Sequence, residues 1–111
     1  MTTSFTAFDY RTRFGPRTFP SPIFTASGCA GSGKELSQFF SLDELGAVVT
    51  KSIALRARSG RPTPRMAETP SGMLNSIGLQ GPGIDQFLDV DIPWLANHGA
   101  RVIVSISGES V

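Results

Sequence analysis

Three short runs of apolar residues along the chain have the length of buried strands. They are Pro22–Ala26, Ala47–Thr50 and Arg101–Ile106. The second run is β-branched and apolar on both faces, a pattern that favours a parallel sheet covered on each side. The pattern therefore predicts three parallel strands.

Between the first two runs, apolar residues recur at the spacing of a helix. Leu36, Phe39 and Phe40 fall on one helical face. Ser32 and Glu35 have the spacing of a capping box, in which each side chain bonds the other residue's backbone at the start of a helix. We therefore predict a helix that opens near Ser32 and carries one apolar face.

A second helical stripe precedes the last predicted strand. Ile84, Phe87 and Leu88 share a face, and Asp91 is placed to cap a further helix. The resulting order, strand–helix–strand–helix–strand, is a βαβαβ unit with a parallel sheet. A complete (β/α)₈ TIM barrel needs about 250 residues. We therefore predict an α/β fold in which residues 1–111 form the N-terminal portion of a single, truncated barrel domain.

The remaining segments lack a clean period. The turn residues of Phe14–Arg17 lie between two extended pieces and predict an N-terminal hairpin. Residues 56–82 are long, irregular and rich in Pro and Gly, which in a compact domain indicates a functional or disordered segment. The arginines between Arg56 and Arg65 belong either to a solvated loop or, within residues 56–74, to a partly mobile cover over a ligand pocket.

Composition narrows the function classes. The net charge is +1, so no strong field favours nucleic acid or an anionic membrane. Cys29 is the only cysteine, which excludes an internal disulfide, and Met1–Tyr10 has no long apolar segment. We expect a cytoplasmic protein without membrane spans. No spacing of His, Cys and carboxylates indicates a metal site.

Small polar residues and one lysine follow the predicted strands. They form the sequences Ala26-Ser27-Gly28, Thr50-Lys51-Ser52 and Ser105-Ile106-Ser107-Gly108. Because the carboxyl ends of parallel strands meet at one edge, where such folds bind ligands, we predict a site for a planar ligand there. Two alternatives stay open: small residues also end strands where loops begin, and Lys51 is either a partner for an anion or a snorkelling lysine at the rim.

Other candidate groups are less specific. The run Asn75–Gln80 offers amide donors and acceptors for a ligand with amide-like edges and a carboxylate, although turn chemistry also explains it. Cys29 lies in a glycine-rich loop before a predicted helix, which favours a thiolate. The only histidine, His98, is distant in sequence, so we interpret Cys29 as a small packing residue.

Several of these stretches together resemble one family. In chain order, the motifs are Ala26-Ser27-Gly28, Gly33-Lys34-Glu35, Val49-Thr50-Lys51-Ser52, Pro62-Thr63-Pro64-Arg65, Glu68-Thr69-Pro70-Ser71-Gly72-Met73-Leu74-Asn75, Ile77-Gly78-Leu79-Gln80 and Pro82-Gly83. Each motif alone is too short to identify a family, but the set of motifs in this order and at this spacing is specific. On these motifs the chain resembles the class 1 dihydroorotate dehydrogenases. The run from Gly78 to Gly83 is more similar to the NAD-linked branch than to the fumarate-using one.

The resemblance implies a flavoprotein that oxidises dihydroorotate to orotate in pyrimidine biosynthesis, built as an eight-stranded barrel with FMN at its carboxyl rim. It implies FMN contacts from residues at the strand ends, namely Ala26, Ser27, Lys51, Ser52 and Ser105. It implies an orotate pocket formed by Lys51, Asn75, Ser76, Ile77, Gly78 and Leu79. Lys51 would reach the substrate carboxylate and Asn75 the pyrimidine edge. A cis peptide at Thr63–Pro64 is implied as well.

Two departures from the family pattern matter. The family usually has Asn where this chain has Ser105, and the shorter serine makes that flavin contact either absent or water-mediated. The family's catalytic cysteine base belongs to a later loop, beyond Val111, and Cys29 does not match it. We therefore expect no catalytic residue, and no turnover, in residues 1–111 alone.

The resemblance also sets expectations for partners and leaves two rivals. It implies a homodimer that binds dihydroorotate and orotate and pairs with an iron–sulfur/FAD electron-transfer subunit. One rival is the FMN barrel of dihydropyrimidine dehydrogenase, against which Asn75–Leu79 argues. The other is a non-catalytic βαβ fragment or binding module, which the missing base favours.

Overall fold

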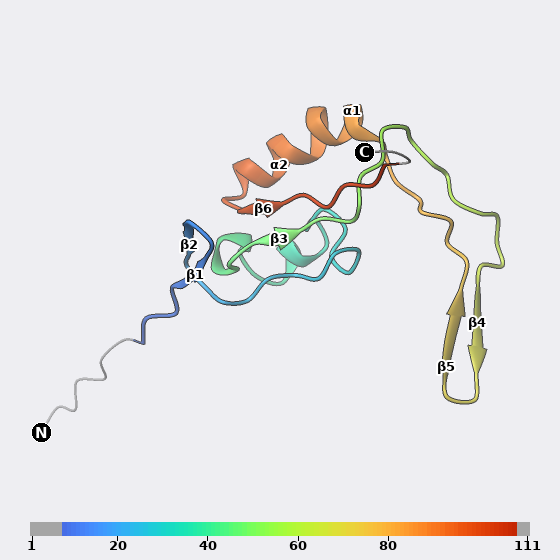
Figure 1. Cartoon of the computed structure of the whole chain (residues 1–111), viewed down its shortest axis with the longest axis horizontal. Coiled ribbons are helices and arrows are strands. Elements are labelled where there is room, and N and C mark those ends of the chain that lie inside the picture. Colours follow the sequence, from blue (N-terminus) through green and yellow to red (C-terminus); the bar gives the residue numbers. More distant parts are fainter. Residues whose placement is uncertain (1–7, 109–111) are drawn as a thin grey trace, which may run out of the picture.

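A parallel pair of short strands, β3 (Val48–Val49) and β6 (Val102–Ile103), lies at the centre of the fold. The structure is a computed structural model, and it describes residues 8–108 (Figure 1). Most of the segment Met1–Tyr10 lies outside the described residues. Val48 pairs with Val102, so the two apolar runs predicted as neighbouring parallel strands are confirmed as such.

The first predicted strand joins this pair by a single bridge. Phe24 pairs in parallel with Ala47, and the Gly46 N–H donates to the Ile23 carbonyl at 2.8 Å. Gly46 permits this approach, since a Cβ there would overlap the Ser21 carbonyl oxygen. The spatial order is therefore the segment around Phe24, then β3, then β6, with all three parallel. The regular strands are shorter than the apolar runs that predicted them.

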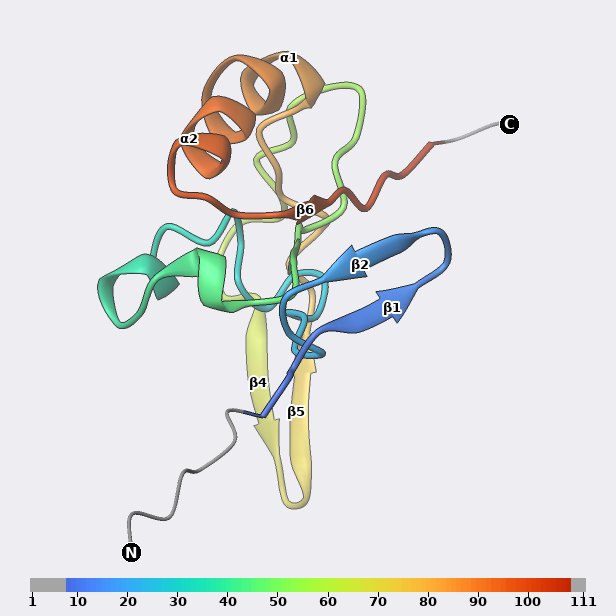
Figure 2. The ribbon, with the colours of Figure 1, turned by 90° about the vertical axis from the view of Figure 1, so that its left-hand side faces the viewer.

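One continuous helical run lies against this sheet. It consists of α1 (Ile84–Gln86), the π-helical turn η3 (Phe87–Asp91) and α2 (Ile92–Asn97). Figures 1 and 2 both place the run along β6. Among residues 8–108, no helix has the length and apolar character needed to cross a bilayer.

The core forms where α2, β3 and a short 3₁₀ turn meet. Leu42, Leu45, Val48 and Leu95 are buried against one another. Leu42 begins the turn η2 (Leu42–Glu44). Burial of side chains of this size stabilises a fold by about 1.5–3 kcal/mol each, so these contacts hold the helix to the sheet.

The helix predicted near Ser32 is wrong in length and in capping. Only a 3₁₀ turn, η1 (Leu36–Gln38), forms, and it has no side-chain cap bond. Phe39 is 82% exposed, so the expected apolar face is not buried within the described residues. The reason is local: Gly31 and Gly33 have positive φ angles, and a segment this short does not sustain a helix without tertiary packing.

Asp91 does not cap a helix, which corrects the second capping prediction. Its backbone is αR (φ −77°, ψ −41°), so the helical run continues through it. Its carboxylate instead accepts a 2.8 Å bond from the ammonium of Lys34. The Lys34 ammonium also lies 5.8 Å from the ring centroid of Trp94, within cation–π distance. This ion pair fastens the glycine-rich loop to the helix.

Two hairpins lie outside the parallel sheet. The predicted N-terminal hairpin is confirmed as β1 (Thr12–Phe14) and β2 (Arg17–Phe19). The irregular segment 56–82 contains a second, unpredicted hairpin of β4 (Met66–Thr69) and β5 (Gly72–Asn75). This hairpin is exposed throughout and projects away from the helix and the parallel strands (Figures 1 and 2).

The ion pair between Lys34 and Asp91 yields a test of stability. In the complete protein, Asp91→Asn should lower the free energy of unfolding by about 1–3 kcal/mol, because a half-buried ammonium loses its charged partner. Urea unfolding followed by circular dichroism measures the loss.

A matched control is the ion pair between Arg11 and Asp9, which has the same 2.8 Å distance but side chains that are 71% and 59% exposed. The hydrogen bond from Arg11 holds the pKa of Asp9 at about 2. Solvent and salt screen such a pair, so Asp9→Asn should leave the unfolding curve almost unchanged. Equal effects of the two substitutions would contradict a structural role for Lys34–Asp91.

Candidate functional site

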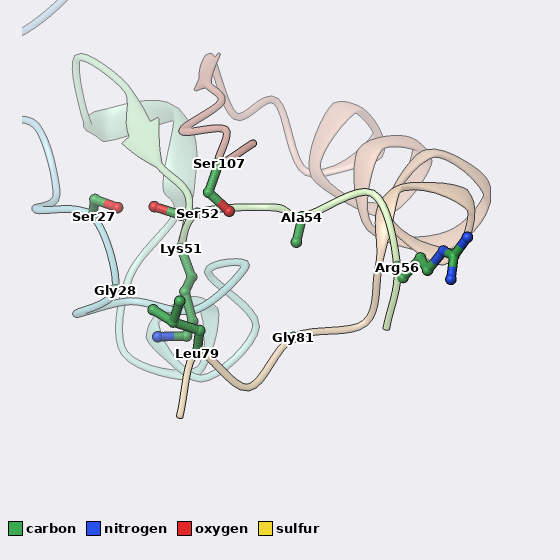
Figure 3. A pocket seen from close by; sticks show the side chains of 9 residues that line it. All are labelled: Ser27, Gly28, Lys51, Ser52, Ala54, Arg56, Leu79, Gly81 and Ser107. Carbon is green, nitrogen blue, oxygen red and sulfur yellow. The ribbon is translucent and has the colours of Figure 1, made fainter. Parts of the chain in front are cut away.

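A cavity of about 150 Å³ lies where the three parallel segments end. Its lining comes from all three strand ends, from the arginine-rich loop and from the segment that follows β5. The lining residues, drawn in Figure 3, are Ser27, Gly28, Lys51, Ser52, Ala54, Arg56, Leu79, Gly81 and Ser107. The strand ends that the sequence predicted to converge therefore line one cavity, and the binding of a ligand there stays a prediction.

Backbone pairing beyond the regular strands brings these residues together. The Ile53 N–H donates to the Ser105 carbonyl at 2.8 Å, and the Ser107 N–H donates to the Ile53 carbonyl at 3.0 Å. Pairing thus continues in the same parallel sense past β3 and β6, with Ile53 opposite Ile106. As a result, the side chains of Ser52 and Ser107 reach the same edge of the sheet.

Hydroxyl groups connect the three strand ends laterally. The Ser27 hydroxyl donates to the Thr50 carbonyl at 2.8 Å, and the Ser105 N–H donates to the Thr50 hydroxyl at 3.3 Å. The hydroxyls of Ser52 and Ser105 lie 2.8 Å apart. Thr50 is only 1% exposed, so it lies directly beneath this edge. The floor of the cavity is therefore held in place by bonds between chain segments distant in sequence.

Lys51 is one of the two charged residues that line the cavity, the other being Arg56. It is half-buried, it lines the cavity, and it also lines an adjoining hollow of about 590 Å³. Its backbone N–H donates to the Gly31 carbonyl at 3.4 Å. Within residues 8–108 its ammonium has no carboxylate partner, and Figure 3 shows the side chain extending beside Leu79. This arrangement favours an anion-binding lysine over a purely snorkelling one.

Glycines leave space for a flat ligand. Gly28 and Gly81 both line the cavity, and a Cβ added to either would meet no atom within 4 Å. Most of the cavity wall therefore consists of glycine, alanine and serine residues, and Lys51, Arg56 and Leu79 complete it. Such a donor set suits a planar, electron-rich ring that carries hydrogen-bonding groups and negative charge.

The cavity contains some of the predicted site residues and not others. Ser27, Lys51, Ser52 and Leu79 line it. Ser105 bonds the Ser52 hydroxyl, and it does not line this cavity, the adjoining hollow or a third cavity of about 850 Å³. Ala26 is exposed and also outside their lining, with its carbonyl closing a turn by accepting a 3.1 Å bond from the Cys29 N–H.

The predicted substrate-binding run forms one side of an irregular ribbon. Asn75 ends β5, and Asn75, Ser76, Ile77 and Gly78 line none of those three cavities. The run pairs instead with the arginine-rich loop, through the bonds Ser76 N–H to Arg65 carbonyl at 2.8 Å and Arg61 N–H to Ile77 carbonyl at 3.0 Å. Leu79, with a φ of 53°, carries the chain from this ribbon into the cavity.

The arginine-rich loop is ordered by the same ribbon. The Arg65 guanidinium donates to the Gln80 side-chain oxygen at 3.1 Å, so this arginine is not merely solvated. The Thr63–Pro64 peptide is cis, as the resemblance implied. The hairpin beyond it projects away from the helical run and from β3 and β6 (Figure 2), so a cover formed by residues 56–74 stays a prediction.

Five lining residues were missing from the predicted contacts: Gly28, Ala54, Arg56, Gly81 and Ser107. Gly28 and Ser107 belong to the predicted strand ends and Gly81 is close to Leu79 in sequence, so these three carried a usable signal. The sequence left Arg56 either in a solvated loop or in a cover over the pocket, and a lone apolar residue such as Ala54 carries no signal. In the part of the chain that is described, no cluster of His, Cys and carboxylates has the geometry of a metal site, and Cys29 is exposed.

The fold and the site together define a class: a parallel α/β protein with a cavity at the carboxyl ends of its strands, where proteins of this kind bind their ligands. Comparison with known proteins narrows it. The family model for dihydroorotate dehydrogenase matches residues 11–111. The chain therefore belongs to the dihydroorotate dehydrogenase family.

Curated relatives agree with this assignment. The chain is 52% identical over 91 residues to the catalytic subunit of dihydroorotate dehydrogenase B (NAD(+)) of Anoxybacillus flavithermus, covering 82% of this chain and 29% of the relative. The chain is also 52% identical over 91 residues to the same-named protein of Alkaliphilus oremlandii, and the match covers 82% of this chain and 30% of that relative. The chain thus spans less than a third of these relatives. The expected similarity to the NAD-linked branch is confirmed.

A solved structure supports the fold alone. The dihydroorotate dehydrogenase of Eimeria tenella, crystallised in complex with ferulenol, superposes with a TM-score of 0.55 at 18% identity, covering 88% of this chain and 28% of that one. The likeness places the chain among proteins of the TIM-barrel family.

The ribbon yields a test based on Gly78, whose φ is +81°. An added Cβ would lie 2.8 Å from the Arg61 backbone nitrogen, so Gly78→Ala should force the two sides of the ribbon apart. We expect tryptic cleavage after Arg58 and Arg65 in the complete protein to become about tenfold faster, since local opening exposes the loop. Mass spectrometry of the fragments over time gives the rates.

Gly15→Ala serves as the control, because Gly15 also has a positive φ (+57°) but nothing within 4 Å of an added Cβ. It carries the backbone strain without the clash, and cleavage after Arg58 and Arg65 should proceed at the wild-type rate. An unchanged rate in Gly78→Ala would show that the pairing does not protect the loop.

Proposed function

We propose that this chain forms the N-terminal part of the FMN-binding barrel of a dihydroorotate dehydrogenase catalytic subunit. The observation that carries the proposal is Lys51: a half-buried ammonium with no carboxylate partner in the described residues, at the carboxyl end of a central parallel strand. Membership in the dihydroorotate dehydrogenase family supports it.

In this proposal the parallel segments around Phe24, β3 and β6 are the first three strands of an eight-stranded barrel that forms a single domain. Their neighbour order and parallel sense support this, as does the helical crossover between β3 and β6. The remaining strands, the phosphate-binding loops and the catalytic base belong to the part of the barrel that the relatives have beyond the matched region.

FMN is the cofactor of the family, and when bound it accepts the hydride that the substrate gives up. In this chain Ser27, Lys51 and Ser52 are the residues proposed to hold one side of its ring. Their shared cavity, and the open space beside Gly28 and Gly81, support the fit. Ala26 and Ser105 complete the proposed set, although Ala26 lines none of the described cavities and Ser105 lies behind Ser52.

The substrate in this proposal is dihydroorotate, whose carboxylate pairs with the Lys51 ammonium. Leu79 lines the same cavity and provides an apolar surface against the substrate ring. Asn75 and residues 76–78 are proposed to orient the pyrimidine edge, which requires the ribbon to move toward the cavity. Fixing the reacting carbon against the flavin in this way supplies much of the rate of a hydride transfer.

The electron acceptor and partners follow from the relatives. Because the relatives named above are catalytic subunits of the NAD(+) type, we propose that this protein works with an iron–sulfur/FAD electron-transfer subunit, as a cytoplasmic homodimer. The match to the dihydroorotate dehydrogenase family over residues 11–111 favours this function over a dihydropyrimidine-reducing barrel and over a non-catalytic module.

Replacement of Lys51 by alanine in the complete protein tests the function. Stopped-flow absorbance would follow the bleaching of the flavin by dihydroorotate. We expect the reduction rate to fall by about 10²–10³-fold, the typical effect of removing one preorganised charge-stabilising group. The absorbance ratio of flavin to protein, measured beforehand, corrects for FMN content.

Arg101→Ala is the matched control. Arg101 is an exposed cation immediately before β6, at the opposite end of the same strand from the cavity. Its removal should leave flavin reduction within about twofold of wild type. A Lys51→Ala protein that reduces as fast as the Arg101→Ala protein would refute the proposed role of Lys51.

A further inference from the structure

A pair of hydroxyl groups lies at the edge of the cavity, and only one of them faces it. The Ser52 and Ser105 oxygens are 2.8 Å apart, and both residues are half-buried. Ser52 lines the cavity, whereas Ser105 does not. Ser105 therefore contacts the site through Ser52.

The backbone of Ser105 is fixed on both sides. Its N–H donates to the Thr50 hydroxyl at 3.3 Å, and its carbonyl accepts from the Ile53 N–H at 2.8 Å. Thr50 is almost fully buried and Ile53 is buried, so neither partner can shift without disturbing the sheet. The Ser105 side chain can change direction only by rotating about its own Cα–Cβ bond.

A hydroxyl group donates one hydrogen bond and accepts up to two. The pair can therefore be ordered in either of two directions. When Ser105 donates to Ser52, the Ser52 proton is available to an acceptor in the cavity. When Ser52 donates to Ser105, the Ser52 lone pairs are available to an N–H in the cavity. In both cases the bond to Ser105 restricts the rotation of the Ser52 hydroxyl.

We propose that Ser105 is a positioning residue, which holds the Ser52 hydroxyl toward the edge of a bound flavin and matches its donor or acceptor character to that edge. The inference rests on the proposed function, which puts FMN in this cavity. In this inference Ser105 does not contact the flavin directly, because the Ser105 hydroxyl and the Ser105 backbone N–H both already bond to the neighbouring strand end. Hydrogen-bonded chains of this kind strengthen each member.

A double-mutant cycle tests the coupling. FMN would be titrated into the flavin-free complete protein, with binding followed by quenching of flavin fluorescence, for Ser52→Ala, Ser105→Ala and the double variant. Each single substitution should raise the dissociation constant about fivefold, the effect of one net hydrogen bond. The double variant should be no weaker than Ser52→Ala alone, because Ser105 acts only through Ser52.

The absorption spectrum of bound FMN separates positioning from general damage. Ser105→Ala and Ser52→Ala should shift the flavin bands in the same direction. Ser37→Ala is the matched control: Ser37 is also half-buried, and its hydroxyl also makes a 2.8 Å bond, to the Lys34 carbonyl, but it lines none of the described cavities. It should shift neither the spectrum nor the FMN affinity. Ser105→Thr keeps the hydroxyl and should restore wild-type values.

The possible results distinguish the two proposals. If the wild-type protein does not bind FMN, the proposed function fails and this inference fails with it. If the wild type binds FMN but Ser105→Ala binds it equally well, only the inference is overturned. The same holds if the two single effects multiply in the double variant, since Ser105 would then act independently of Ser52.

Discussion

Val48 pairs with Val102 and, further along, Ile53 pairs with Ile106, so the segments after β3 and β6 stay side by side in the parallel sense. The site depends on this pairing. It brings Lys51 and Ser52 to the edge where Ser105 and Ser107 emerge, although more than fifty positions separate them in sequence. The alignment is held by burial, since Val48 is fully enclosed by leucines of η2 and α2. The register changes by one residue between the Val49–Ile103 pair and the Ile53–Ile106 pair, so the segment after β3 carries one extra residue where it reaches the site.

Two kinds of polar group share the site and behave differently. The hydroxyls of Ser27, Thr50, Ser52 and Ser105 are bonded to one another or to the backbone. In the described residues no buried side-chain nitrogen or oxygen lacks a partner. The hydroxyls form a rigid frame before any ligand binds. The Lys51 ammonium keeps its bonding capacity for a ligand while its stem lies against the protein. Preorganised dipoles combined with an unpaired cation suit an anionic ring, because little rearrangement is needed when it binds.

The sequence predicted the parallel core and the convergence of strand ends, because an unbroken apolar run such as 47–50 fits few environments. Lys51 was predictable for the same reason, as a charge directly after such a run. Local capping patterns failed. Ser32 had the spacing of a helix cap, but the positive φ angles of the glycines beside it prevent a regular helix there. Asp91 had suitable spacing too, but its carboxylate pairs with Lys34, which is 57 residues away in sequence. The hairpin at 66–75 and the cavity contact of Arg56 depend on pairing partners that no local pattern reveals.

The π-helical turn brings Phe87 toward the face of the helix that carries Asp91 and Leu95. An α-helix advances about 100° per residue, so residues eight apart differ by about 80° in direction. Phe87, Asp91 and Leu95 are nevertheless all buried, and the wider turn from Phe87 to Asp91 reduces the rotation between them. Asp91, which holds Lys34, and Leu95, which enters the leucine core, are four residues apart, so α-helical geometry alone places them on one face. Loss of a single residue within the turn would leave these two attachments together and change only the direction of Phe87 relative to them.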